Sequence, residues 1–126
     1  MSYQLLKGKK GIISGALDEN SIAWKIAQRA HEEGATFTLT NAPIAMRMGE
    51  INKLAEKCQT EVIPADATSM EDLEKLFVTA QEKLGGKIDF VLHSIGMSVN
   101  VRKGVPYTEL NYDYLNKTLD VSAISL

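Results

Sequence analysis

The chain lacks cysteine pairs, clustered metal ligands and a strong excess of one charge, and each absence excludes a class of protein. Cys58 is the only cysteine among the 126 residues, which rules out an internal disulfide and a cysteine-based metal cluster. His31 and His93 have no partner at metal-ligand spacing, so we expect no metal site. The formal net charge of −2 argues against nucleic acid as the main partner.

Targeting and membrane segments are missing from the sequence too. Residues 1–4 do not begin a charged region followed by a long apolar run, so no secretory signal is predicted. No apolar run approaches the roughly 18 residues that a membrane-spanning helix requires. With 44% hydrophobic and 24% charged residues, the composition is that of an ordinary soluble globular protein. We therefore expect a cytoplasmic protein without membrane partners.

A strand, a glycine turn and a helix N-terminus are predicted near the start of the chain. The apolar residues 11–13 precede Gly15, and an amphipathic segment opens at Ser21. Free N–H groups and the positive end of the helix dipole make such a corner suitable for a pyrophosphate. Gly15 is the only glycine between Ile13 and Gly34, however, so the G-x-G-x-x-G fingerprint is absent. An ordinary corner in which Ser21 caps the helix fits equally well.

Strand and helix patterns then alternate along the whole chain. The predicted strands are residues 11–13, 36–40, 61–65 and 88–93, and the predicted helices are residues 21–33, 44–58, 69–84 and 107–126. This alternation predicts an α/β fold with a Rossmann-like, doubly wound parallel sheet. We expect the sheet to be incomplete, with about four strands in the order 3-2-1-4.

Two predictions concern what the helices bury. Helical spacing places five apolar residues on the inner face of the first helix, namely Ile22, Ala23, Ile26, Ala27 and Ala30. Cys58 falls on the apolar face of the second helix, where a buried and inert thiol is expected.

The turns that follow the four predicted strands should meet at one edge of the sheet. Gly15, Asn41, Asp66 and Ser94 each come directly after a strand or one residue later. Ligands of open parallel sheets bind beyond the carboxyl ends of the strands, so this edge is the predicted functional site.

Four short patterns resemble the bacterial enoyl-acyl carrier protein reductases, a divergent branch of the short-chain dehydrogenase/reductase family. The wider family usually has three glycines in the first turn and Asn-Ala-Gly after the fourth strand. This branch has serine at the third glycine position and Ser-Ile-Gly after the fourth strand. The patterns here are Gly15-x5-Ser21-Ile22-Ala23, Asp66-Ala67, His93-Ser94-Ile95-Gly96 and Asp120-Val121-Ser122.

The resemblance implies a role for each turn. The pyrophosphate of a nicotinamide cofactor would lie against Gly15, Ser21 and Ile22, and its adenine against Asp66 and the backbone of Ala67. The residues implied on the nicotinamide ribose side are Ser94, Ile95 and Gly96, with Ser98 beside the acyl chain of the substrate. Each also has a plain structural reading: Ser21 as a cap, Asp66 as a turn residue and Gly96 as a hinge.

The choice between NADH and NADPH rests on the end of the second strand. The acidic residue that usually binds the ribose 2′-hydroxyl is absent from Thr40-Asn41-Ala42-Pro43. Arg47, a few residues further on, could bind a 2′-phosphate, but it is equally typical of a solvent-exposed charge on a helix. The resemblance favours NADH and leaves NADPH open.

The catalytic residues of the family are not found in this sequence. They form a Tyr-x6-Lys pair on a later helix, and Tyr3 and Lys10 have that spacing only before the first strand, at the wrong edge of the sheet. The resemblance therefore implies that residues 1–126 are the N-terminal part of a single Rossmann domain, truncated before the catalytic helix. The whole protein would reduce a trans-2-enoyl thioester bound to acyl carrier protein, as a homotetramer. A 3-oxoacyl-type reductase and a non-catalytic nucleotide-binding module remain the alternatives.

Overall fold

The computed structural model describes residues 4–43, 50–95, 106, 109 and 111–126. The chain divides into two compact units, residues 1–94 and residues 95–126. The first unit contains the sheet and the helices packed on it, and the second contains a helix near the C-terminus.

A parallel sheet organises the first unit, which confirms the predicted α/β class. Its strands are β1 (Lys10–Ser14), β2 (Thr36–Thr40) and β3 (Phe90–Leu92), in the order β2-β1-β3. β1 is the central strand, and its residues 11–14 are buried, as expected for a strand that is covered on both faces. Among the described residues β3 is an edge strand.

The prediction of a strand over residues 61–65 is wrong, since the described sheet has three strands and not four. The segment does run beside β2, where the predicted order places it, but it forms only an isolated bridge between Val62 and Leu39. The N–H groups of Ile63 and Ala65 donate to the carbonyls of Leu39 and Asn41, at 2.8 and 3.0 Å. Pro64, between these donors, has no N–H to offer a further strand on the other side, so the segment suits the outer edge of the sheet among the described residues.

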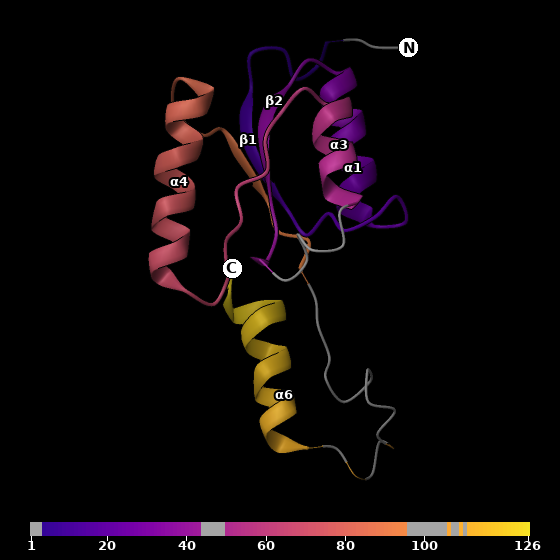
Figure 1. Cartoon of the computed structure of the whole chain (residues 1–126), viewed down its shortest axis with the longest axis vertical. Helices are drawn as coiled ribbons and strands as arrows, with labels where there is room; N and C mark the ends of the chain where they lie inside the picture. Colours follow the sequence, from indigo (N-terminus) through magenta and orange to yellow (C-terminus); the bar gives the residue numbers. More distant parts are fainter. Residues whose placement is uncertain (1–3, 44–49, 96–105, 107–108, 110) are drawn as a thin grey trace. The chain divides into compact units, whose positions relative to one another are not determined.

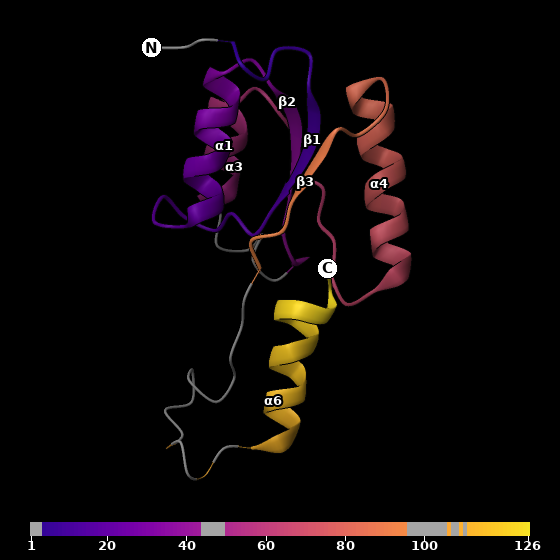
Figure 2. The same cartoon turned by 180° about the vertical axis from the view of Figure 1, so that it is seen from behind.

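Helices cover both faces of the sheet (Figures 1 and 2). α1 (Ile22–Glu32) and α3 (Glu50–Lys57) lie on one face, and α4 (Met70–Leu84) lies on the other. The larger core fills the α1 and α3 side and includes Trp24, Phe37, Leu39, Ile51 and Leu54. The smaller core on the α4 side contains Ile12, Ala65, Leu76 and Ala80.

The buried face of α1 differs from the prediction. Ala23, Ala27 and Ala30 are buried as expected, but Ile22 is 72% exposed and Ile26 is 39% exposed. The wide apolar side chain on the inner face is Trp24, which is only 3% exposed. Three alanines let the helix approach the sheet closely, and the indole fills the space beside them.

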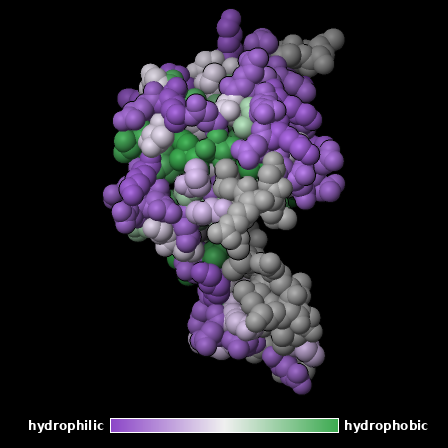
Figure 3. Space-filling model, in the orientation of Figure 1, coloured by the Kyte–Doolittle hydropathy of each residue, from purple (hydrophilic) through white to green (hydrophobic). Residues whose placement is uncertain are grey.

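α4 begins and ends as its sequence predicts. The Ser69 hydroxyl accepts a hydrogen bond from the backbone N–H of Asp72 at 3.3 Å, which caps the first turn. Gly85 ends the helix with a left-handed φ of 75°. Hydrophobic residues are visible at the surface over α4 and between α4 and the sheet (Figure 3), and the exposed ones on this helix include Met70, Phe77 and Val78.

Cys58 is buried directly after α3, as predicted. Its thiol lies 3.9 Å from the carbonyl oxygen of Ala27 and is 6% exposed as a residue. Burial raises the pKa of the Cys58 thiol, and the nearby Lys57 ammonium opposes this with a smaller effect. The thiol is therefore held in its neutral form.

The second unit contains α6 (Tyr112–Leu119), which continues into a short π-helix, η2 (Asp120–Ile124). The start of the helix was predicted at residue 107, but α6 begins at Tyr112. Asn111 sets that boundary because its side-chain oxygen accepts from the N–H of Tyr114 at 3.1 Å. None of the helices among the described residues is long and apolar enough to cross a membrane.

Candidate functional site

The parallel register brings three turns to the carboxyl edge of the sheet. Ser14 is level with Thr40 of β2, and Ile13 is level with Leu92 of β3. The Ser14 hydroxyl also donates to the carbonyl oxygen of Leu92 at 2.6 Å, which holds the ends of β1 and β3 together. The residues that follow these strands therefore start from one edge, as predicted.

Gly15 makes the turn that leaves β1. Its φ is 89°, a left-handed conformation that residues with a Cβ rarely adopt. Its N–H donates to the carbonyl oxygen of Thr40 at 3.2 Å, so the turn is attached to the end of β2. The glycine is thus required by the backbone conformation itself.

Ser21 occupies the N-cap position of α1, but its side chain does not cap the helix. The hydroxyl accepts from the N–H of Leu17 at 3.1 Å and donates to the carbonyl oxygen of Asp18 at 2.6 Å. Ser21 therefore has the N-cap position that the plain structural reading expects, but its side chain does not make the capping hydrogen bond. The hydroxyl stabilises the loop, and the Ser21 side chain leaves the N–H groups of the first turn of α1, next to the exposed Ile22, without a capping hydrogen bond from this residue.

Asp66 lies at the surface after the segment that runs beside β2. Its Oδ1 atom accepts from the backbone N–H and the hydroxyl of Thr68, at 2.9 and 2.7 Å. Its own N–H donates to the Asp72 carboxylate at 2.9 Å. Asp66 thus has the predicted turn geometry, with Ala67 half-buried at the corner. Contact with adenine stays a prediction for both residues.

Asn41 links these turns, a role that the sequence analysis missed. Its side-chain Nδ2 donates to the carbonyl oxygen of Ala16 at 2.8 Å, and its Oδ1 accepts from the N–H of Ala42 at 2.8 Å. Its backbone oxygen accepts from the N–H of Ala65 at 3.0 Å. The only signal in the sequence was an asparagine directly after a strand, a common turn former.

Of the remaining predicted residues, the structure describes only Ser94 and Ile95. Ser94 is half-buried two residues after β3 ends, at the close of the first unit, and Ile95 opens the second. Gly96, Ser98 and Arg47 lie outside the described residues. Their roles stay predictions.

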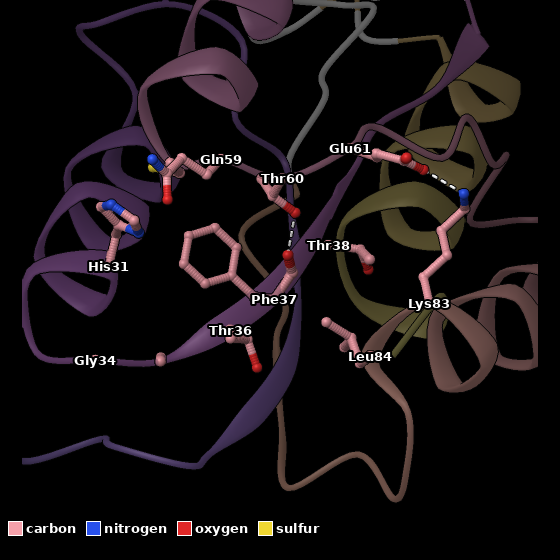
Figure 4. A pocket seen from close by; sticks show the side chains of 12 residues that line it. His31, Gly34, Thr36, Phe37, Thr38, Gln59, Thr60, Glu61, Lys83 and Leu84 are labelled. Atoms are coloured by element: carbon pink, nitrogen blue, oxygen red, sulfur yellow. Dashed lines mark hydrogen bonds and ion pairs between the residues drawn. The ribbon is translucent and has the colours of Figure 1, made fainter.

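A hollow of about 530 Å³ opens elsewhere on the first unit (Figure 4). It lies beside the start of β2, where Thr36 is level with Lys10 at the amino end of β1. An ion pair between Lys83 and Glu61 borders it. None of the predicted cofactor residues that the structure describes lines this hollow, so we place the candidate site at the carboxyl edge and not here. The lining residues are His31, Gly34, Ala35, Thr36, Phe37, Thr38, Cys58, Gln59, Thr60, Glu61, Lys83 and Leu84.

The parallel sheet and its carboxyl edge define a Rossmann-like α/β fold. A family model described as enoyl-(acyl carrier protein) reductase matches residues 15–126. The chain belongs to the enoyl-(acyl carrier protein) reductase family.

Solved structures and curated sequences agree with this assignment. The crystal structure of FabI from Alistipes finegoldii aligns at 67% identity with a TM-score of 0.93, over 98% of this chain and 47% of that one. The FabI-NADH complex from the same organism aligns at 67% identity with a TM-score of 0.94, over 98% of this chain and 44% of that one.

Among curated relatives, an NADH-dependent enoyl-[acyl-carrier-protein] reductase of Rhizobium meliloti is 33% identical over 122 residues, 96% of this chain and 44% of the relative. FabI of Rickettsia prowazekii is 34% identical over 130 residues, 100% of this chain and 48% of the relative. The chain spans about half the length of the relatives it matches.

Proposed function

We propose that this chain is the N-terminal half of an NADH-dependent enoyl-acyl carrier protein reductase that acts in fatty acid biosynthesis. The observation that carries the proposal is the FabI-NADH complex, whose fold this chain shares at 67% sequence identity. The substrate would be a trans-2-enoyl thioester on acyl carrier protein. Bound NADH would supply the hydride that reduces its double bond.

The residues at the carboxyl edge suit a dinucleotide. The turn at Gly15 and the uncapped first turn of α1 offer backbone N–H groups and the positive end of a helix dipole, which favour a pyrophosphate. We assign Ser21 and Ile22 to this part of the cofactor, and Asp66 and Ala67 to its adenine. On the nicotinamide ribose side we place Ser94, Ile95 and Gly96, with Ser98 beside the acyl chain.

NADH is the proposed cofactor because the curated relatives carry NADH in their names. NADPH stays the alternative, since a 28% identical enoyl reductase from Bacillus cereus was solved with NADP+. The end of β2 carries Asn41 in place of a carboxylate, and this residue would not repel a 2′-phosphate.

The catalytic tyrosine and lysine would lie outside residues 1–126, so this stretch alone should be inactive. We also propose that the whole protein is a cytoplasmic homotetramer. The exposed edge strand β3, with Val91 50% exposed, and the exposed Phe77 and Val78 on α4 are apolar surface that further chain or subunits would cover.

The test is turnover by the protein in which these residues continue to their natural terminus. Loss of NADH absorbance, and separately of NADPH absorbance, is followed with crotonyl thioester, with a 3-oxoacyl thioester as the competing substrate. Oxidation of NADH that requires the enoyl thioester is expected. Turnover of only the 3-oxoacyl thioester would assign a different reductase, and nucleotide binding without turnover of either would indicate a non-catalytic module.

A further inference from the structure

Asn41 directly follows β2, in the stretch where many dinucleotide-binding folds carry an acidic residue that binds the ribose 2′-hydroxyl. In this chain each end of its side-chain amide makes a hydrogen bond within the protein. Nδ2 donates to the Ala16 carbonyl at 2.8 Å, and Oδ1 accepts from the Ala42 N–H at 2.8 Å. The amide is thus directed to the neighbouring turns.

The atoms that Asn41 holds belong to the turns assigned to the cofactor. Ala16 directly follows Gly15, and Ala65, whose N–H donates to the Asn41 carbonyl at 3.0 Å, directly precedes Asp66. Ala16 is fully buried and Ala65 is 5% exposed, so water cannot easily replace these hydrogen bonds. A single residue thereby connects the turn after β1, the turn after β2 and the turn that carries Asp66.

We propose that Asn41 is a positioning residue that sets the spacing between the pyrophosphate turn and the adenine turn, and that it is not a ligand of the ribose. This inference rests on the proposed function for the identity of the cofactor. The hydrogen-bond network itself is independent of that function.

The substitution Asn41→Asp separates the two roles because it keeps the shape of the side chain and replaces a donor by an acceptor. In a positioning role, a carboxylate oxygen would face the Ala16 carbonyl, the turn would shift, and NADH would bind about five- to tenfold more weakly. In a ribose-binding role, the new carboxylate would accept from the 2′-hydroxyl and NADH would bind more tightly.

The experiment titrates NADH into the full-length protein and its Asn41→Asp, Asn41→Ala and Asn52→Asp variants. Asn52 is exposed on α3, so Asn52→Asp makes the same chemical change outside the proposed site. Amide hydrogen exchange at Gly15 is measured in parallel without nucleotide. Unchanged exchange across the helices then verifies that each variant is folded.

Weaker NADH binding in both Asn41 variants, with faster exchange at Gly15 and no change in Asn52→Asp, is the expected result. Equal or tighter binding in Asn41→Asp, or unchanged exchange at Gly15, would overturn the proposal. If the unmodified protein binds no NADH, the proposed function fails. Exchange at Gly15 then decides the positioning role by itself.

Discussion

Two glycines with left-handed backbones allow backbone strain to be separated from nucleotide binding. Gly15 has a φ of 89° at the carboxyl edge, and Gly85 has a φ of 75° at the end of α4. Alanine at either position should lower the free energy of unfolding by about 1 to 2 kcal/mol, because the new Cβ disfavours this conformation. Only Gly15→Ala should also weaken NADH binding, as the turn reshapes around its Cβ.

Urea unfolding and NADH titration of both variants check this prediction, with Gly85→Ala as the matched control for strain. Equal loss of NADH affinity in the two variants would show that the effect comes from general destabilisation and not from the Gly15 turn.

Cys58 gives a pH dependence with a defined sign. Burial raises the pKa of its thiol above the ordinary value of 9.0, so the unfolded chain releases this proton at a lower pH than the folded one. The contribution of the buried Cys58 thiol to the free energy of unfolding is fully present below pH 9.0. It is lost as the pH rises through the higher pKa of the folded state. The loss should approach, at most, about 1.4 kcal/mol per pH unit within that window.

Urea unfolding on both sides of pH 9.0 measures this slope in the unmodified protein and in Cys58→Ala. The variant should be less stable at neutral pH because it leaves a small cavity, but its stability should fall less steeply at alkaline pH. Identical slopes in the two proteins would rule out the thiol as their source.

The local sequence predicted that the turns after the strands meet at one edge of the sheet, but it did not predict the hydrogen bonds that their side chains make. The position of Ser21 at the start of a helix follows from its neighbours, whereas the partners of its hydroxyl depend on how the loop folds back to Asp18. The hydrogen bond from Asn41 to Ala16 joins residues that are 25 positions apart in the sequence, and no local sequence pattern predicts a contact over that separation.

At the scale of elements, α1 gives a sharp test of which face is buried. Trp24 is 3% exposed within the larger core, and Ile22 is 72% exposed two residues earlier. Trp24→Ala should lower the free energy of unfolding by about 3 to 5 kcal/mol, because it removes a large buried side chain. Ile22→Ala should change it by no more than about 0.5 kcal/mol.

Denaturant titration without nucleotide compares the two variants, since Ile22 is also assigned to the cofactor site. A loss from Ile22→Ala as large as that from Trp24→Ala would restore the helix face predicted from hydrophobic spacing.

Helices and strands were predictable where the hydrophobic pattern and the capping residues agree. They were less predictable where pairing with another strand determines whether a regular strand forms. α4 was predictable because apolar spacing, the Ser69 cap and Gly85 all mark one helix. The segment 61–65 has the composition of a strand, but only its pairing with Leu39 determines how regular it becomes. The face of α1 was misread because spacing alone does not tell whether Ile22 or Trp24 packs on the sheet.

At the scale of the whole molecule, the central claim is that NADH binds at the carboxyl edge of the sheet. The first unit offers two candidate regions in which a ligand could bind. One is the set of turns at Gly15, Asn41 and Asp66, and the other is the hollow beside the start of β2. They lie at opposite ends of β2, so protection of backbone amides by a bound ligand distinguishes them.

The most direct measurement is amide hydrogen exchange of the full-length protein with and without NADH. We expect slower exchange at residues 15–22, 66–68 and 93–95 when NADH is present, and no change at residues 36–38, 59–61 and 83–84. Protection confined to the second set, which surrounds the hollow, would contradict the proposed site.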